Sequence, residues 1–237
     1  MKRKFVQQAV LISVLVLPAL IYIVFINGQQ GIFFETLDYV GPTTLVDGPK
    51  GEEEQHYSLG EWSFTDIDSN AFGSQELDST IYVLSFFFAT CPTVCPAMNF
   101  HLNDIERRWV GSPDIKLVSI TVDPEKDTPA RLKKYAADNG YNTDKWIFLT
   151  GDEEEIYAFA KRAFLNAFED HTAPGGFLHS QSAILVDWNG RIRSRRDDLG
   201  NLVGSYDVLD ATQLKAMESD IKVLNAEFHR EKHNKKK

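Results

Sequence analysis

The sequence predicts an α/β fold, and three observations support that prediction. Apolar runs rich in β-branched and aromatic residues recur along the chain, as is typical of strands buried on both faces. Segments with helical periodicity lie between these runs. An Asn-Gly turn near the C-terminal end joins two further predicted strands, which indicates a β-hairpin. Strands that alternate with helices along a chain are typical of α/β proteins.

The first predicted elements surround a pair of cysteines. Residues 62–65 alternate in polarity and are expected to form a short strand. Residues 80–88, with the sequence TIYVLSFFF, are almost continuously apolar and are expected to form the central strand. Residues 94–109 are expected to form a helix, because apolar side chains recur on one face. We interpret Met98 on that face as an ordinary core methionine.

The remaining elements continue the alternation. Thr128 and Pro129 are typical of a helix N-cap and of the first helical position, and this helix is expected to end at Asn139-Gly140. Asp152 is expected to cap another helix. Further strands are expected at 115–122, 146–149, 182–187 and 191–194, and further helices at 153–164 and 210–228. By analogy, this order indicates a thioredoxin-like sandwich.

The N-terminal segment, residues 1–27, is predicted to be a transmembrane anchor helix. Residues 9–26 are apolar apart from Ser13 and Pro18, and a helix of that length rises roughly 27 Å, close to the hydrocarbon thickness of a bilayer. The basic residues before the run favour a cytoplasmic N-terminus and an exported domain. The alternative is a cleaved signal peptide, although no A-x-A pattern follows the run. No cysteine lies near it, so a lipoprotein anchor is not expected.

We therefore expect a single-pass protein of the cell inner membrane whose soluble domain lies on the periplasmic side. Residues 28–55, with Gly-Pro pairs and an acidic run, are expected to be a linker. Residues 56–229 are expected to form one domain, and residues 230–237 a basic tail. Residues 1–4 carry +3 and the tail carries +4, so the net charge of −9 leaves −16 on residues 5–229. A net charge this negative on residues 5–229 argues against nucleic-acid binding, which needs a basic surface.

The two cysteines of the chain, Cys91 and Cys95, lie between the predicted central strand and the following helix. Their spacing places both sulfurs on one face once the helix has begun, and a helix N-terminus favours thiolates. Pro92 and Pro96 limit the flexibility of the loop. A dithiolate of this kind can exchange disulfides or bind a soft metal ion; three intervening residues favour a shared ion. A structural disulfide here would close too small a loop to stabilise the fold much.

Three segments together resemble the Sco/SenC family of copper chaperones. In chain order they are YVLSFFFATCPTVCP, SITVDPEKDTPARLKKYA and FLHSQSAILVDWNGRI. The resemblance covers residues 57–228 and implies a thioredoxin-like fold. It also implies that Cys91, Cys95 and His179 bind copper, and that the protein helps to build the dinuclear copper centre of cytochrome c oxidase.

The resemblance extends to residues around the three implied ligands. Asp123 and Asp127 match acidic positions of the second segment. We interpret Asp127 as a loop or helix-start residue, and Asp123 as structural or as a support for the metal ligands. Thr93 stands where the family often has an acidic residue, and Leu178 stands where Asp often precedes the histidine. These departures bear on copper affinity and redox tuning more than on copper binding. The other histidines lie outside the three segments, at positions 56, 101, 171, 229 and 233.

The leading hypothesis is a copper metallochaperone rather than an enzyme, since no bond in a substrate is broken. It would hold Cu(I), with Cu(II) left open, and pass the ion to the copper subunit of a membrane oxidase, of the cytochrome c oxidase subunit II type. The sequence does not identify the copper donor. The alternative is a thiol–disulfide oxidoreductase that uses Cys91 and Cys95 to reduce the copper-ligand cysteines of its target. A peroxidase or redox sensor is a third hypothesis, weakened because no arginine is clearly placed beside Thr90.

Overall fold

The structure, a computed structural model, divides the chain by its contacts into two units, Met1–Thr36 and Leu37–Lys237. It describes residues 16–18, 36–48, 51–92, 94–165, 167–169, 177–179 and 181–235, and for 167–169 and 177–179 it describes the backbone. Residues 16–18 are helical, and the rest of the predicted anchor lies outside the described residues. Within the described ranges, no helix is both long and apolar enough to cross a membrane.

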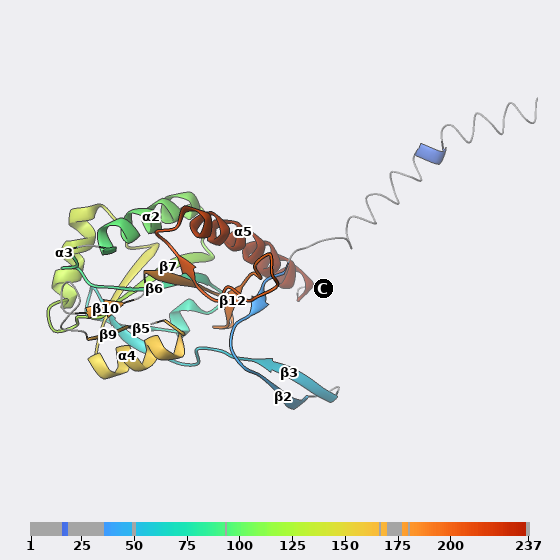
Figure 1. Cartoon of the computed structure of the whole chain (residues 1–237), viewed down its shortest axis with the longest axis horizontal. Helices are drawn as coiled ribbons and strands as arrows, with labels where there is room; N and C mark the ends of the chain where they lie inside the picture. The colour runs from blue at the N-terminus through green and yellow to red at the C-terminus, as the bar shows by residue number, and fades with distance from the viewer. Residues whose placement is uncertain are drawn as a thin grey trace, which may run out of the picture. The chain divides into compact units, whose positions relative to one another are not determined.

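A nine-stranded mixed sheet forms the centre of the second unit (Figure 1). β6 (Ile81–Phe87) and β7 (Ile115–Thr121) run parallel in its middle, and β8 (Trp146–Thr150) continues the parallel part. Every residue of β6 is buried, which confirms the prediction of a central strand covered on both faces. β11 (Ser182–Val186) runs antiparallel to both β6 and β12 (Ile192–Ser194), and β11 and β12 form the predicted hairpin.

Short strands complete the two edges of the sheet. They are β1 (Asp38–Tyr39), β4 (Ser63–Asp66), β5 (Ala71–Gly73) and β13 (Tyr206–Asp207). β1 pairs with β12, and β13 pairs with β11. On the other side of the sheet, β4 pairs with both β8 and β5. Strands of two to four residues need such neighbours, because they have few ladder hydrogen bonds of their own.

The segment predicted to be a linker contains a β-hairpin. β2 (Thr43–Gly48) pairs with β3 (Gly51–His56) along its whole length, and β1 lies in the same segment. The described part of residues 28–55 is therefore largely extended and paired, unlike the predicted linker. The β-branched residues of β2 favour a strand. Nearly all side chains of β2 and β3 are exposed, however, so the two segments lack the alternation of apolar and polar residues from which a hairpin could be predicted.

Helices cover the sheet on both faces: α2 (Val94–Trp109), α3 (Pro129–Asn139), α4 (Glu153–Arg162) and α5 (Ala211–Asn234), with a short 3-10 turn, η1 (Gln75–Leu77). Figure 1 shows α2 and α5 along one side of the sheet and α4 along the other. Neighbouring residues of β6 face opposite ways: the Phe86 ring packs on Phe159 of α4, and the Phe87 ring on Tyr135 of α3.

The ends of the helices follow the capping residues that the sequence predicts. Thr128 accepts a hydrogen bond from the Arg131 amide at the start of α3, and Gly140 ends that helix with φ +68°. Asp152 caps α4 in the same way. By contrast, α5 continues to Asn234, so most of the predicted basic tail is helical.

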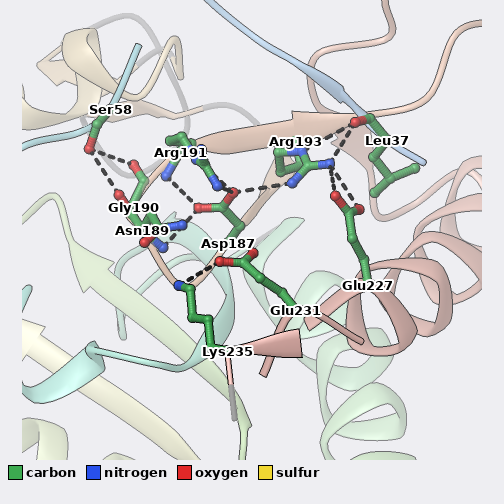
Figure 2. A network of polar contacts seen from close by, with 10 residues as sticks. All are labelled: Leu37, Ser58, Asp187, Asn189, Gly190, Arg191, Arg193, Glu227, Glu231 and Lys235. Carbon is green, nitrogen blue, oxygen red and sulfur yellow. Dashed lines mark hydrogen bonds and ion pairs between the residues drawn. The ribbon is translucent and has the colours of Figure 1, made fainter. Parts of the chain in front are cut away.

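A buried arginine joins the start of the second unit to its last helix (Figure 2). The Arg193 guanidinium is 1% exposed and donates to the Leu37 carbonyl oxygen at 2.7 Å and to both Glu227 oxygens at 2.9 Å. It also donates to Asp187 Oδ2 at 3.2 Å, which in addition accepts from Arg191 Nε. A buried charge is costly without partners, so separating Arg193 from any of these groups would be unfavourable. The network therefore fixes Leu37, the β11–β12 hairpin and α5 relative to one another.

Arg193→Ala is expected to lower the free energy of unfolding by about 3–5 kcal/mol, since the buried Asp187 would lose one of its partners. The matched control is Arg196→Ala, which removes an exposed pair with Asp38 and should cost under about 1 kcal/mol. Urea unfolding of the full chain in detergent, followed by tryptophan fluorescence, measures both. Equal losses in the two variants would contradict this account of the network.

Candidate metal centre

The two cysteines lie where the central strand is followed by a helix, as predicted. β6 ends at Phe87 and α2 begins at Val94, so Cys91 lies in the connection and Cys95 in the first turn of the helix. Cys91 is 8% exposed and Cys95 is 1% exposed. The Cys95 backbone N–H donates to Cys91 Sγ at 3.4 Å. A donor that the helix start leaves without an intrahelical partner thus points at a sulfur and favours negative charge there.

The two sulfurs also interact with each other. A side-chain hydrogen bond to Cys91 raises the pKa of the Cys95 thiol far above its ordinary value, and burial raises it further. The charge of Asp127 acts in the same direction, and a backbone hydrogen bond with Phe88 opposes them. Cys95 therefore keeps its proton until a positive charge takes the place of that proton. Sulfurs that share a hydrogen bond are close enough to contact one ion, so the donor set fits a single soft metal ion.

The carboxylate of Asp127 holds the cysteine loop in place. Its Oδ2 accepts from the Ala89 backbone N–H at 2.8 Å and from Thr121 Oγ1 at 2.6 Å. Its Oδ1 lies 3.4 Å from Arg131 Nε, and the side chain is fully buried. Burial raises the pKa of Asp127, while its hydrogen bonds with Thr121 and Ala89 lower it. Asp127 thus joins the loop two residues before Cys91 to the end of β7 and the start of α3.

Asp123 shapes the turn between β7 and α3. Its backbone N–H donates to Thr121 Oγ1 at 3.1 Å, and its carbonyl oxygen accepts from the Asp127 amide at 2.9 Å. Its Oδ2 pairs with Lys126 Nζ at 2.9 Å. Asp123 therefore places Asp127, which accords with the structural interpretation of both aspartates.

One helical turn after Cys95, α2 carries a polar side chain with a partner on α3 that the sequence did not predict. Asn99, one helical turn after Cys95, is fully buried, and its Nδ2 donates to Tyr135 Oη at 2.7 Å. The Tyr141 ring lies beside Tyr135, with the two ring centroids 6.0 Å apart. Burial raises the pKa of Tyr135, and the charge of Cys95 adds to that effect, so the phenol lies near enough to sense the sulfur. The available signal was a polar residue at i+4 from Cys95, on the helix face that also carries Met98 and Leu102.

His179 is the last residue of β10 (Phe177–His179), which pairs with β9 (Ala167–Glu169). In this register His179 lies opposite Ala167. Its side chain and Thr93 lie outside the description. Among the side chains that are described, no group of three or more His, Cys, Asp or Glu could hold a metal. The grouping of His179 with the two cysteines therefore stays a prediction.

Clefts of the described surface lie away from the cysteines. One, of about 480 Å³, is lined in part by Asp78, Tyr82 and Trp188, at the amino end of β6. Two others, of about 440 and 500 Å³, lie around Trp62. The cysteines lie beyond the opposite, carboxyl end of β6. The first cleft therefore lies at the opposite end of β6 from the cysteines.

The fold and the cysteine pair define a thioredoxin-like α/β domain with a buried dithiol at a helix N-terminus. Comparison with known proteins identifies the family. The profile of the family described as SCO1/SenC matches residues 50–202. This chain belongs to that family, which confirms the resemblance drawn from the three sequence segments.

Individual relatives agree with this assignment. The SCO1 protein homolog of Bacillus subtilis is 29% identical over 147 residues, which are 61% of this chain and 76% of that protein. BsSco, described as a member of the Sco family of cytochrome c oxidase assembly proteins with a disulfide switch, is 27% identical; the match covers 72% of this chain and 94% of BsSco, with a TM-score of 0.60. The structure of Bradyrhizobium japonicum ScoI with copper bound is 26% identical; the match covers 66% of this chain and 96% of ScoI, with a TM-score of 0.51. The structural matches confirm the thioredoxin-like fold.

Asp127→Ala is expected to lower the free energy of unfolding by about 2–6 kcal/mol, because two donors, the Ala89 amide and the Thr121 hydroxyl, lose their acceptor at about 1–3 kcal/mol each. Asp127→Asn keeps one acceptor oxygen and should lie between the alanine variant and wild type. The control is Asp138→Ala, which removes an exposed pair with Lys134 on the same helix and should cost under about 1 kcal/mol. Chemical unfolding measures the stability of all three variants. An Asp127→Ala variant as stable as wild type would refute the role of Asp127 in holding the cysteine loop.

Proposed function

We propose that this chain is a copper metallochaperone that holds the ion with Cys91, Cys95 and His179. The observation that carries the proposal is the hydrogen-bonded sulfur pair at the N-terminus of α2. Thiolates are soft ligands that suit Cu(I), and this pair is buried, close together and supplied with a backbone donor. The copper-bound structure of ScoI, a protein with the same fold, supports copper as the ion.

The residues of the chain allow the ion to be both held and exchanged. Cys95 gives up its proton when the pair takes up copper and regains it on release, so transfer is coupled to proton movement. Cys91, nearer to solvent than Cys95, is the sulfur that an incoming ligand reaches first. Delivery is then an exchange of ligands with the receiving protein, in which no substrate bond breaks. The proposed role is therefore that of a chaperone rather than an enzyme.

His179 supplies the third ligand in this proposal. An imidazole added to two thiolates gives a trigonal site suited to Cu(I), and imidazole also suits Cu(II). The backbone pairing of β10 with β9 supports a defined approach of His179, because the hairpin limits where its Cα lies. Thr93 and Leu178 supply no carboxylate near the ligands, so the affinity is set mainly by the three ligands themselves.

The proposed setting is the inner membrane, with residues 1–27 as a single-pass anchor and the copper site on the periplasmic side. The basic residues before the apolar run and its length support that orientation. The proposed partner is the copper subunit of a membrane oxidase, of the cytochrome c oxidase subunit II type. It is supported by the description of BsSco as a cytochrome c oxidase assembly protein.

Anaerobic titration of the reduced full chain with Cu(I), in competition with a chromophoric chelator, tests the proposal. Wild type should take up one copper per chain, and Cys95→Ser should lose stoichiometric uptake. His179→Ala should weaken binding by about 100-fold or more, since a ligand matters at least as much as its supporting groups. His171→Ala is the matched control from the same region and should bind as wild type does.

Three results of this titration would refute the proposal: no stoichiometric uptake by wild type, full affinity in Cys95→Ser, or equal losses in His171→Ala and His179→Ala. Circular dichroism of each variant separates a loss of ligand from a loss of fold.

The direct contact between the sulfurs also favours a second candidate, a thiol–disulfide oxidoreductase. In that reaction a Cys91 thiolate would attack a target disulfide, and Cys95 would displace the reduced target from the mixed disulfide, leaving both cysteines oxidised. His179 is dispensable for this chemistry. If copper transfer is the function, His179→Ala should fail to restore oxidase activity in cells lacking the chain, yet should reduce a disulfide-bonded peptide at the wild-type rate. Full restoration of oxidase activity by His179→Ala would favour the oxidoreductase instead.

A further inference from the structure

The end of α5 projects beyond the core and is rich in cations. Phe228 is its last buried side chain, and the helix continues to Asn234. Residues 229–235 are exposed except for Glu231, which is half-buried. Arg230, Lys232 and Lys235 lie on this extension, and two more lysines follow in the sequence. Cations near a helix C-terminus stabilise it through the helix macrodipole. That effect does not explain why α5 continues for more than a turn beyond Phe228, its last contact with the core.

The ion pairs of these cations leave a net positive end. Lys235 pairs with Glu231, and Lys232 lies 3.8 Å from Asp114 and over the Phe228 ring. Such exposed pairs are weak and exchange readily. Glu231 is the one acid in residues 229–237, so this end carries a formal +4, whereas residues 5–229 carry −16. The basic end of α5 and the acidic body would therefore respond in opposite ways to a negatively charged surface.

The second unit begins, at Leu37, beside the C-terminal part of α5. Arg193 donates to both the Leu37 carbonyl oxygen and the Glu227 carboxylate, which places Leu37 next to α5 one turn before Arg230 (Figure 2). Ten residues separate Leu37 from the apolar run that ends at Ile26, and they span at most about 35 Å when fully extended. The chain itself thus keeps the end of α5 within reach of the membrane that holds the anchor.

We propose that the basic end of α5, residues 229–235, rests on anionic phospholipid headgroups of that membrane. The inference rests on the proposed anchor and adds a second, electrostatic contact. Clusters of lysine and arginine close to a membrane attract anionic lipid. The acidic body is repelled by the same surface, so the two effects turn the domain in one direction.

This contact would set the direction in which the copper site faces. Asp114, which contacts His229 and Lys232, immediately precedes β7, and its carbonyl oxygen accepts from the first amide of β6. The end of α5 therefore lies at the amino ends of the central parallel strands. Cys91 follows the carboxyl end of β6, a strand of seven residues that spans roughly 20 Å. With the basic end on the lipid, the cysteines face away from the membrane, toward an exported partner.

Hydrogen exchange of the full chain in symmetric vesicles tests the inference. Exchange of the amides in residues 229–235 should be about fivefold slower in vesicles containing phosphatidylglycerol than in pure phosphatidylcholine, because the lipid contact suppresses fraying. Half-molar salt should abolish the difference. The double variant Lys232→Gln/Lys235→Gln should show no difference in exchange between the two kinds of vesicle. Lys215→Gln/Lys222→Gln is the matched control: both lysines are exposed on α5, yet the nearer of them, Lys222, is roughly 15 Å along the helix axis from Lys232, more than one Debye length.

Equal exchange in the two kinds of vesicle would overturn the inference and would leave an acidic protein as the partner of this end. Equal effects of the two double variants would overturn it too, because the attraction would then not be local to residues 229–235. Flotation with pure phosphatidylcholine vesicles tests the anchor separately. A chain that floats but shows no lipid-dependent protection refutes the lipid contact alone, whereas a chain that fails to float refutes the proposed anchor.

Discussion

The buried carboxylate of Asp127 is the contact on which the arrangement of the cysteine loop depends. It accepts a hydrogen bond from the Ala89 amide, two residues before Cys91. The same side chain contacts Thr121 at the end of β7 and Arg131 in α3, so it joins the cysteine loop to a segment more than 30 residues later in the chain. The hydrogen bonds of Asp127 offset part of the cost of burying this carboxylate, and they fix the backbone of the cysteine loop at Ala89.

That fixed loop explains the properties of the two sulfurs. The first turn of α2 aims the Cys95 amide at Cys91, while Cys95 itself is buried and hydrogen-bonded to the other sulfur. The pair is therefore unequal: a backbone N–H points at the Cys91 sulfur, whereas the raised pKa of Cys95 favours its thiol form. Such asymmetry suits a site that must release its ion, because the proton that returns to Cys95 competes with the metal.

The sequence predicted the elements that carry this loop, because their signals are local. A continuous apolar run defines β6, and Thr128, Gly140 and Asp152 define helix ends through their own backbone contacts. The hairpins β2–β3 and β9–β10 were not predicted, since their short or exposed strands carry little burial pattern. The chain from Asn99 to Tyr135 depends on the packing of α2 against α3, which no single segment encodes. For the same reason, the side-chain position of His179 cannot be derived from its neighbours.

Copper K-edge X-ray absorption of the Cu(I)-loaded full chain would show whether two sulfurs and one imidazole hold a single copper ion. We expect two sulfur scatterers and one nitrogen scatterer per copper, with imidazole outer-shell features that disappear in His179→Ala. A coordination shell of sulfur alone in the wild type, or an unchanged nitrogen contribution in His179→Ala, would contradict this expectation.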